Sequence, residues 1–171
     1  MLKTHIFRAS SAVALAASVA AVAAAPAAAR PPAKIALHKS VGGIALGTKP
    51  AAVQRKLGKP SQVIRTGGKI SEMQYNNYGL NIQFDTLHKG DPADFVGNNE
   101  GSRYHTSKGI HNGSTVKALK RAYGRSLTHH IGGYALNVDG KFGAPGSRRT
   151  DFEVFDGKVT QIAVQINFND V

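Results

Sequence analysis

The chain of 171 residues contains no cysteine. That absence excludes a lipid-modified cysteine, a disulfide framework, thiolate metal sites and a cysteine nucleophile. Two further patterns are missing: the G-x-x-x-x-G-K-[ST] loop of nucleotide-binding proteins and a G-x-S-x-G nucleophile elbow after a buried strand. Acidic residues are few, since 10 Asp and Glu stand against 22 Lys and Arg, which gives a net charge of +12.

The N-terminal segment has the pattern of a secretory signal peptide. Lys3 and Arg8 form a positive start, and an uncharged run rich in Ala and Val covers residues 11–29. The run is weakly hydrophobic for a permanent anchor, which needs about 20 predominantly apolar residues. We therefore expect cleavage between Ala29 and Arg30, no stable transmembrane segment afterwards, and a secreted, periplasmic or cell-envelope location.

The part of the chain that follows this cleavage site suits one domain, or two small repeats that share a core. It carries a net charge of +10, because residues 1–29 hold two basic and no acidic residues. The two halves of this stretch are similarly basic. Such a chain is attracted to anionic surfaces such as phosphate-rich wall polymers, anionic lipid or acidic proteins. The alternative is that the charge mainly serves solubility.

One motif occurs twice. Gly43–Thr48 leads into Ala52–Gly58, and Gly109–Ser114 leads into Ala118–Gly124. The offset between the copies is constant, because it is the same at the first glycine of the motif as at the last. Equal spacing of this kind is typical of two copies of one supersecondary unit.

In the first copy the motif predicts a short helix followed by strands. Thr48 is a candidate N-cap, and Gly58 suits the position after the last helical turn. Strands are expected over 61–65, 69–76 and 80–85, because apolar and polar residues alternate in the last of them.

The second copy repeats this order. Ser114 is the expected N-cap, and Tyr123 ends the apolar stripe of the helix. Strands are predicted over 134–138, 150–155 and 158–168. The inward-facing set of the last strand changes parity, so we predict a β-bulge near Thr160 and Gln161.

These elements predict an α+β fold of two tandem helix-plus-antiparallel-sheet repeats, with the short helices packed on one face of the sheet. The chain divides into a signal peptide (1–29), an extended linker (30–40), repeat 1 (41–87), a connecting loop (88–105) and repeat 2 (106–171).

The first motif resembles the helix motif of a known superfamily. It reads G-x5-V-x3-L-G-x-P after a leading Gly-Ile, with Gly47, Val53, Leu57, Gly58 and Pro60 at the defined positions. This pattern is similar to that of the BLIP-like and SmpA-like superfamily, which contains the β-lactamase inhibitory protein and the small lipoprotein of the outer-membrane barrel-assembly machinery. The second copy departs from the pattern, because Tyr123 replaces the Leu and Ser126 replaces the Pro.

The resemblance implies tandem units whose combined sheet presents a concave face to a protein partner. It implies a binding module rather than a catalyst. The inhibitor's disulfides and the lipoprotein's lipidated cysteine are both absent here, and the matched positions are turn, cap and packing positions. No contact residue is carried over from either protein.

The residues that bear chemistry give weak patterns. His129 and His130 are adjacent, so on a strand they point to opposite faces and cannot readily share a metal. Asp85, Asp91 and Asp94 lack the frame of a calcium loop. We therefore expect no metal and no cofactor, while a Ser/His/Asp triad assembled from distant residues stays open.

The candidate binding residues are Tyr, Phe and Arg side chains in or beside predicted hairpins, because Tyr and Arg are enriched at binding hot spots. They are Tyr75, Tyr78, Phe142, Arg148 and Arg149. The alternative is that the aromatic rings pack under loops and the arginines are solvated.

The sequence therefore predicts an exported, non-enzymatic binding module that recognises a protein or an anionic envelope component through its sheet face and loops. Nucleic acid is not the expected partner, because export removes the chain from most of it. The alternatives are a structural envelope component held by charge and an unrecognised hydrolase.

Overall fold

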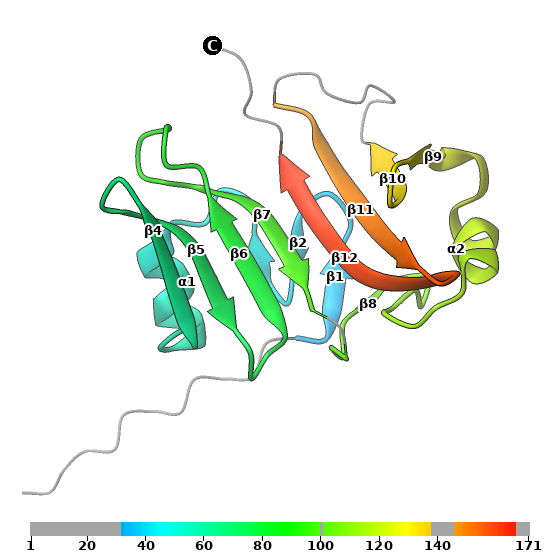
Figure 1. Cartoon of the computed structure of the whole chain (residues 1–171), viewed down its shortest axis with the longest axis horizontal. Coiled ribbons are helices and arrows are strands. Elements are labelled where there is room, and N and C mark those ends of the chain that lie inside the picture. Colours follow the sequence, from blue (N-terminus) through cyan, green and yellow to red (C-terminus); the bar gives the residue numbers. More distant parts are fainter. Residues whose placement is uncertain (1–31, 100, 138–145, 167–171) are drawn as a thin grey trace, which may run out of the picture.

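A large antiparallel sheet dominates the fold. The computed structural model describes residues 32–99, 101–137 and 146–166. Eight strands form the large sheet: β4 (Gln62–Thr66), β5 (Lys69–Tyr75), β6 (Leu80–Phe84), β7 (Ala93–Asn98), β9 (Leu127–His130), β10 (Gly133–Asn137), β11 (Arg148–Phe155) and β12 (Lys158–Ile166). Their spatial order is β4-β5-β6-β7-β12-β11-β10-β9 (Figure 1).

A second, smaller sheet has four short strands in the order β3-β2-β1-β8. They are β1 (Lys34–Ala36), β2 (Ser40–Val41), β3 (Ile44–Ala45) and β8 (His105–Thr106). The predicted extended linker over 30–40 is therefore wrong where the structure describes it. Ile35 pairs with Val41 in this sheet and is 1% exposed, so burial of its side chain orders the segment.

Two helices of eight residues precede the two groups of large-sheet strands: α1 (Pro50–Leu57) and α2 (Val116–Tyr123). Gly58 and Gly124 follow them with positive φ, as predicted. The predicted N-caps are each one residue early, since the caps are Lys49 and Thr115. The lysine side chain has no acceptor atom, so α1 has no side-chain cap, whereas Thr115 caps α2 by accepting the Ala118 N–H.

The helices and the small sheet share one core with one face of the large sheet. Val53 and Leu57 of α1 and Leu119 of α2 are buried in this core. From the large sheet, Leu80, Ile82 and Phe84 point inward as their alternation predicts, and so do Met73, Val96, Phe152, Ile162 and Val164. We call the opposite side of the large sheet the open face; Figure 1 views the described residues from that side, with α1 and the small sheet behind the strands.

The predicted connecting loop over 88–105 is wrong in its middle, because β7 occupies Ala93–Asn98. β7 lies at the centre of the large sheet, between β6 and β12. Its junction with β12 runs from Phe95–Gln165 to Asn98–Ile162. The fully buried Asn98 reinforces this junction, since its Oδ1 accepts the Ile162 N–H at 2.6 Å.

The three strands predicted for the second half correspond to β10, β11 and β12, while β9 was not predicted. Glu153 pairs with Gln161 and Val154 with Val159, so Thr160 has no counterpart on β11. This is the predicted β-bulge. Among the described residues no helix has the length and apolar character to cross a membrane, and the predicted signal peptide lies outside them.

Candidate functional site

Basic and acidic residues are separated between the two layers. Residues 32–59 and 101–126, which form the small sheet, the helices and their loops, contain 12 Lys and Arg and no Asp or Glu. We call these residues the basic layer. The described large-sheet segments, 60–99, 127–137 and 146–166, contain six basic and seven acidic residues. The two halves of the sequence are similarly basic, but in the fold the excess of positive charge lies in the basic layer.

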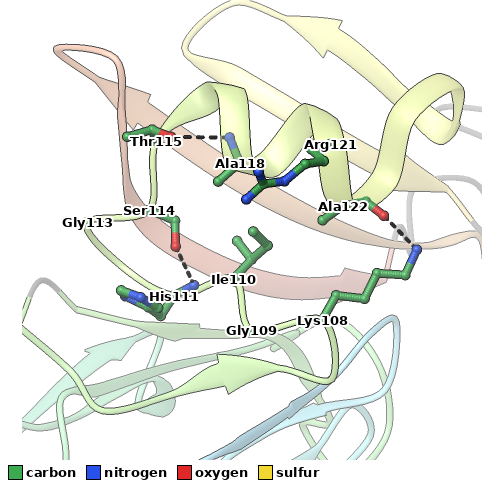
Figure 2. Close-up of a pocket in the computed structure, with 10 residues that line it drawn as sticks. All are labelled: Lys108, Gly109, Ile110, His111, Gly113, Ser114, Thr115, Ala118, Arg121 and Ala122. Atoms are coloured by element: carbon green, nitrogen blue, oxygen red, sulfur yellow. Dashed lines mark hydrogen bonds between the residues drawn. The ribbon is translucent and has the colours of Figure 1, made fainter.

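The basic layer contains a hollow of about 490 Å³ between α2 and the loop that precedes it (Figure 2). Lys108 lies at one end of the hollow and His111 at the other, while the Arg121 side chain extends from the helix between them. Its apolar lining includes Ile110, which is 4% exposed, and Ala118. The hollow thus combines an apolar floor with a cationic rim.

Hydrogen bonds within the loop fix the hydroxyl groups that line the hollow. Ser114 Oγ accepts the His111 N–H at 3.0 Å, and Thr115 Oγ1 accepts the Ala118 N–H at 3.2 Å. Because each oxygen accepts a backbone N–H, each hydroxyl proton is available for another acceptor. The His111 Nδ1 lies 2.6 Å from the Asn112 carbonyl oxygen, and this contact requires a proton on Nδ1.

Lys108 closes one end of the hollow. Its Nζ donates to the Ala122 carbonyl oxygen at 2.6 Å, close to the C-terminal end of α2. A cation near the last carbonyls of a helix is favourable. The same ammonium lies 4.9 Å from the centroid of the Tyr123 ring. Two interactions therefore hold the charge in place.

The corresponding position beside α1 is arranged differently. Lys56 is the counterpart of Ala122 in the first copy of the motif, and its Nζ donates to the Gly43 carbonyl oxygen at 2.6 Å. This side chain spans from α1 to the loop in front of it. Beside α2, alanine ends at Cβ and makes no such span.

The open face carries a polar network around Asp151, which is 6% exposed. Its Oδ2 accepts the Arg149 Nε–H at 2.9 Å and a hydrogen bond from Gln165 Nε2. Its Oδ1 lies 3.5 Å from His130 Nε2. The other ring nitrogen of His130 contacts the Ile131 carbonyl oxygen at 2.8 Å. Both nitrogens of His130 thus face acceptors, which does not suit a general base.

The predicted binding residues do not form one site. Tyr75 is fully buried, so its assignment to a binding surface is wrong; it follows Met73 by two residues and shares that inward face. Tyr78 is half-buried and its ring centroid lies 6.3 Å from that of Tyr75. Arg148 is exposed at the start of β11, and Arg149 belongs to the Asp151 network. Phe142 lies outside the described residues.

Burial shifts the pKa of three groups that do not line the hollow. Desolvation raises the pKa of Tyr75 to about 12, and the nearby Tyr78 adds to the effect. Desolvation also raises the pKa of Tyr123, against a lowering contribution from Thr106, and lowers the pKa of His38. These phenols are therefore neutral structural groups at physiological pH.

The loop between β6 and β7 carries Asp85, His88 and Asp91, and Asp94 follows in β7. Burial acts to raise the pKa of Asp85, but hydrogen bonds from Leu87 and His88 outweigh it and lower the pKa. Burial raises the pKa of Asp94, and the charge of Asp85 adds to that rise. Across the described part of the chain, no group of three or more His, Asp or Glu side chains is arranged to hold a metal ion. The Asp85–His88 contact of 2.5 Å is a local turn interaction.

The sequence analysis did not identify three residues of the hollow, the basic Lys108 and Arg121 and the imidazole of His111. A usable signal was present: the two motif copies differ in charge at several loop and helix positions. Comparing the copies position by position marks Lys108 against Gly42 and Ala122 against Lys56.

Comparisons with known proteins leave the family of this chain open. No family model matches the sequence, and no curated protein matches it. Among solved structures, the chain is similar to a DUF4309 family protein (YjgB) from Bacillus subtilis subsp. subtilis str. 168, with a TM-score of 0.45 and 13% sequence identity. The match covers 74% of this chain and 84% of that chain.

Proposed function

We propose that the protein is an exported, non-enzymatic binding module that recognises an anionic envelope component. The observation that carries this proposal is the charge of the basic layer, where 12 basic residues meet no acidic residue. A one-sided charge of this kind attracts polyanions and orients the molecule on them. The open face does not share this charge, so we assign the anionic partner to the basic layer rather than to the sheet face.

We also propose that the fold arose from two tandem units. The helices α1 and α2 have the same length, and the offset between their first residues equals the offset between their last. The same offset relates two pairs of backbone bonds: Gly47 and Thr48 bond Ala93, and Gly113 and Ser114 bond Val159. This agreement supports a duplicated unit. Membership of the BLIP-like and SmpA-like superfamily stays a proposal carried by the motif.

Charge reversal on the two sides of the molecule tests the binding proposal. The probe is a phosphate-rich wall polymer coupled to beads, with the mature protein as the soluble partner. One variant carries Lys34→Glu, Lys117→Glu and Arg125→Glu in the basic layer. The control carries Arg65→Glu, Lys89→Glu and Arg148→Glu in the large-sheet segments, and all six side chains are exposed.

Both variants change the net charge equally, so only the location of the charge differs. Three lost ion pairs of about 0.5 kcal/mol each weaken binding about tenfold in the basic-layer variant. The control should stay within about twofold, and higher salt should weaken every complex. Equal weakening in the two variants would refute a directional basic layer. If the amount of protein bound to the polymer beads keeps rising without saturation, the result would instead favour a structural component held by charge.

An unrecognised hydrolase is the second class of function. The residues to change are His129 and His130, of which His130 approaches Asp151. Hydrolytic activity lost in His130→Ala would replace the binding proposal with an enzymatic one.

A further inference from the structure

The hollow beside α2 differs from its counterpart beside α1 in ways that create space and move charge. Four pairs of matching positions in the two motif copies show the difference. The pairs, first near α1 and then near α2, are Gly42 and Lys108, Ala45 and His111, Lys49 and Thr115, and Lys56 and Ala122. The helix position changes from a long side chain to a short one, while two loop positions gain nitrogen donors.

This exchange leaves the hollow open. Beside α1, Lys56 reaches the Gly43 carbonyl oxygen and fills the space between helix and loop. Beside α2, Ala122 contributes only a methyl group to the lining. The ammonium of Lys108 enters from the loop and stays at the end of the hollow, held by the Ala122 carbonyl oxygen.

We propose that this hollow binds a phosphoryl group, and the proposal rests on the anionic partner proposed above. Lys108 and Arg121 supply two positive charges, and no acidic residue lies in the basic layer to neutralise them. The guanidinium fork of arginine matches the oxygens of a phosphate, and lysine acts as a point charge on them.

The hydroxyl groups strengthen the preference for a multi-oxygen acceptor. Ser114 and Thr115 both line the hollow, and their oxygens already accept backbone N–H groups. Their O–H protons are therefore free to donate to a ligand oxygen. The apolar lining from Ile110 and Ala118 suits the carbon side of a phosphate ester. The expected ligand is thus a phosphate mono- or diester.

A single substitution separates this site from general charge attraction. Ala122→Lys restores the residue found at the α1 position and fills the hollow, yet it raises the net charge by one. Ala51→Lys adds the same charge on the exposed surface of α1 and is the matched control. General attraction predicts tighter binding for both variants, whereas the proposed site predicts weaker binding for Ala122→Lys alone.

The probes are glycerol 3-phosphate, inorganic phosphate, acetate, and vesicles containing phosphatidylglycerol. Binding of the small probes to the mature protein is followed through the amide NMR shifts of Ser114 and Thr115. Glycerol 3-phosphate should bind at least about tenfold more weakly to Ala122→Lys than to the wild type, with Ala51→Lys unchanged or slightly tighter. Arg121→Gln, at an exposed side chain, gives a second test if Ala122→Lys lowers the melting temperature.

If inorganic phosphate binds as tightly as glycerol 3-phosphate, the result supports free phosphate as the ligand. Tighter binding of glycerol 3-phosphate, lost in Ala122→Lys, supports a phosphate ester as the ligand, and tighter binding of the vesicles, lost in the same variant, supports a lipid headgroup. Unchanged or tighter binding of glycerol 3-phosphate to Ala122→Lys overturns the site, and so does acetate that binds equally well. In that case salt-sensitive binding of the wall polymer would still support the proposed function, which fails if the basic-layer reversal weakens binding no more than the control reversal does.

Discussion

Replacing Asp151 with asparagine removes one negative charge from the open face without changing the size of the side chain. The carboxylate accepts a charge-assisted bond from Arg149 at 2.9 Å and lies 3.5 Å from His130 Nε2. A hydrogen bond to a charged group is worth about 1.5–3 kcal/mol when it is protected from water. The Arg149 side chain is 30% exposed, so the lower half of that range applies.

We therefore expect Asp151→Asn to lower the free energy of unfolding by about 2 kcal/mol at pH 7. For a chain of this size that loss corresponds to a melting temperature lower by about 6 °C. Urea titration gives the free energy and scanning calorimetry the melting temperature. The urea m-value should stay constant, because the surface exposed on unfolding does not change.

A double-mutant cycle with Arg149→Gln separates the pair from its surroundings. The coupling energy between Asp151 and Arg149 should be about 1 kcal/mol. Additive effects of the two substitutions, or an Asp151→Asn variant within about 0.5 kcal/mol of the wild type, would show that desolvation cancels the attraction in this network.

Two further predictions follow from shifted pKa values. Ultraviolet titration should show Tyr75 ionising near pH 12. Because the tyrosine of the unfolded chain ionises first, stability should fall as pH rises from about 10 to 12. Tyr75→Phe should make that fall smaller, and the part due to Tyr123 should remain. A Tyr75 that ionises near its ordinary value would contradict this. Asp94→Asn should stabilise the protein at pH 7, because burial and the charge of Asp85 raise the pKa of Asp94 and disfavour its ionised form in the fold. Thermal melts should show this gain disappearing as pH falls below the ordinary carboxyl pKa, and a destabilised variant at pH 7 would contradict the reasoning.

Signals from neighbouring residues in the sequence predicted the C-terminal ends of both helices and the β-bulge. Gly58 and Gly124 end their helices because both adopt positive φ, where a side chain is disfavoured. The bulge at Thr160 was predictable because side chains alternate between the two faces of a strand. Val159 and Ile162 are three residues apart, so both can face the core only if one extra residue lies between them. These features depend on a few adjacent residues, so the sequence is sufficient for them.

Features set by distant contacts were harder to predict. β7 lacks an alternating pattern because its outward residue Gly97 lies against the Phe95 ring and its last residue, Asn98, is a buried amide. Only the neighbouring strands make this segment a strand. The separation of charge between layers has the same origin, because halves of similar charge fold so that their basic segments lie on one side.

The junction between β7 and β12 also determines how the protein unfolds. Main-chain bonds and the Asn98 side chain cross it, and it joins the two groups of four strands into one sheet. Separating the groups would expose two central strand edges at once, together with buried Val96 and Val164. The two halves should therefore lose structure in one cooperative step, and a fragment that ends after β7 should self-associate through the exposed edge of that strand.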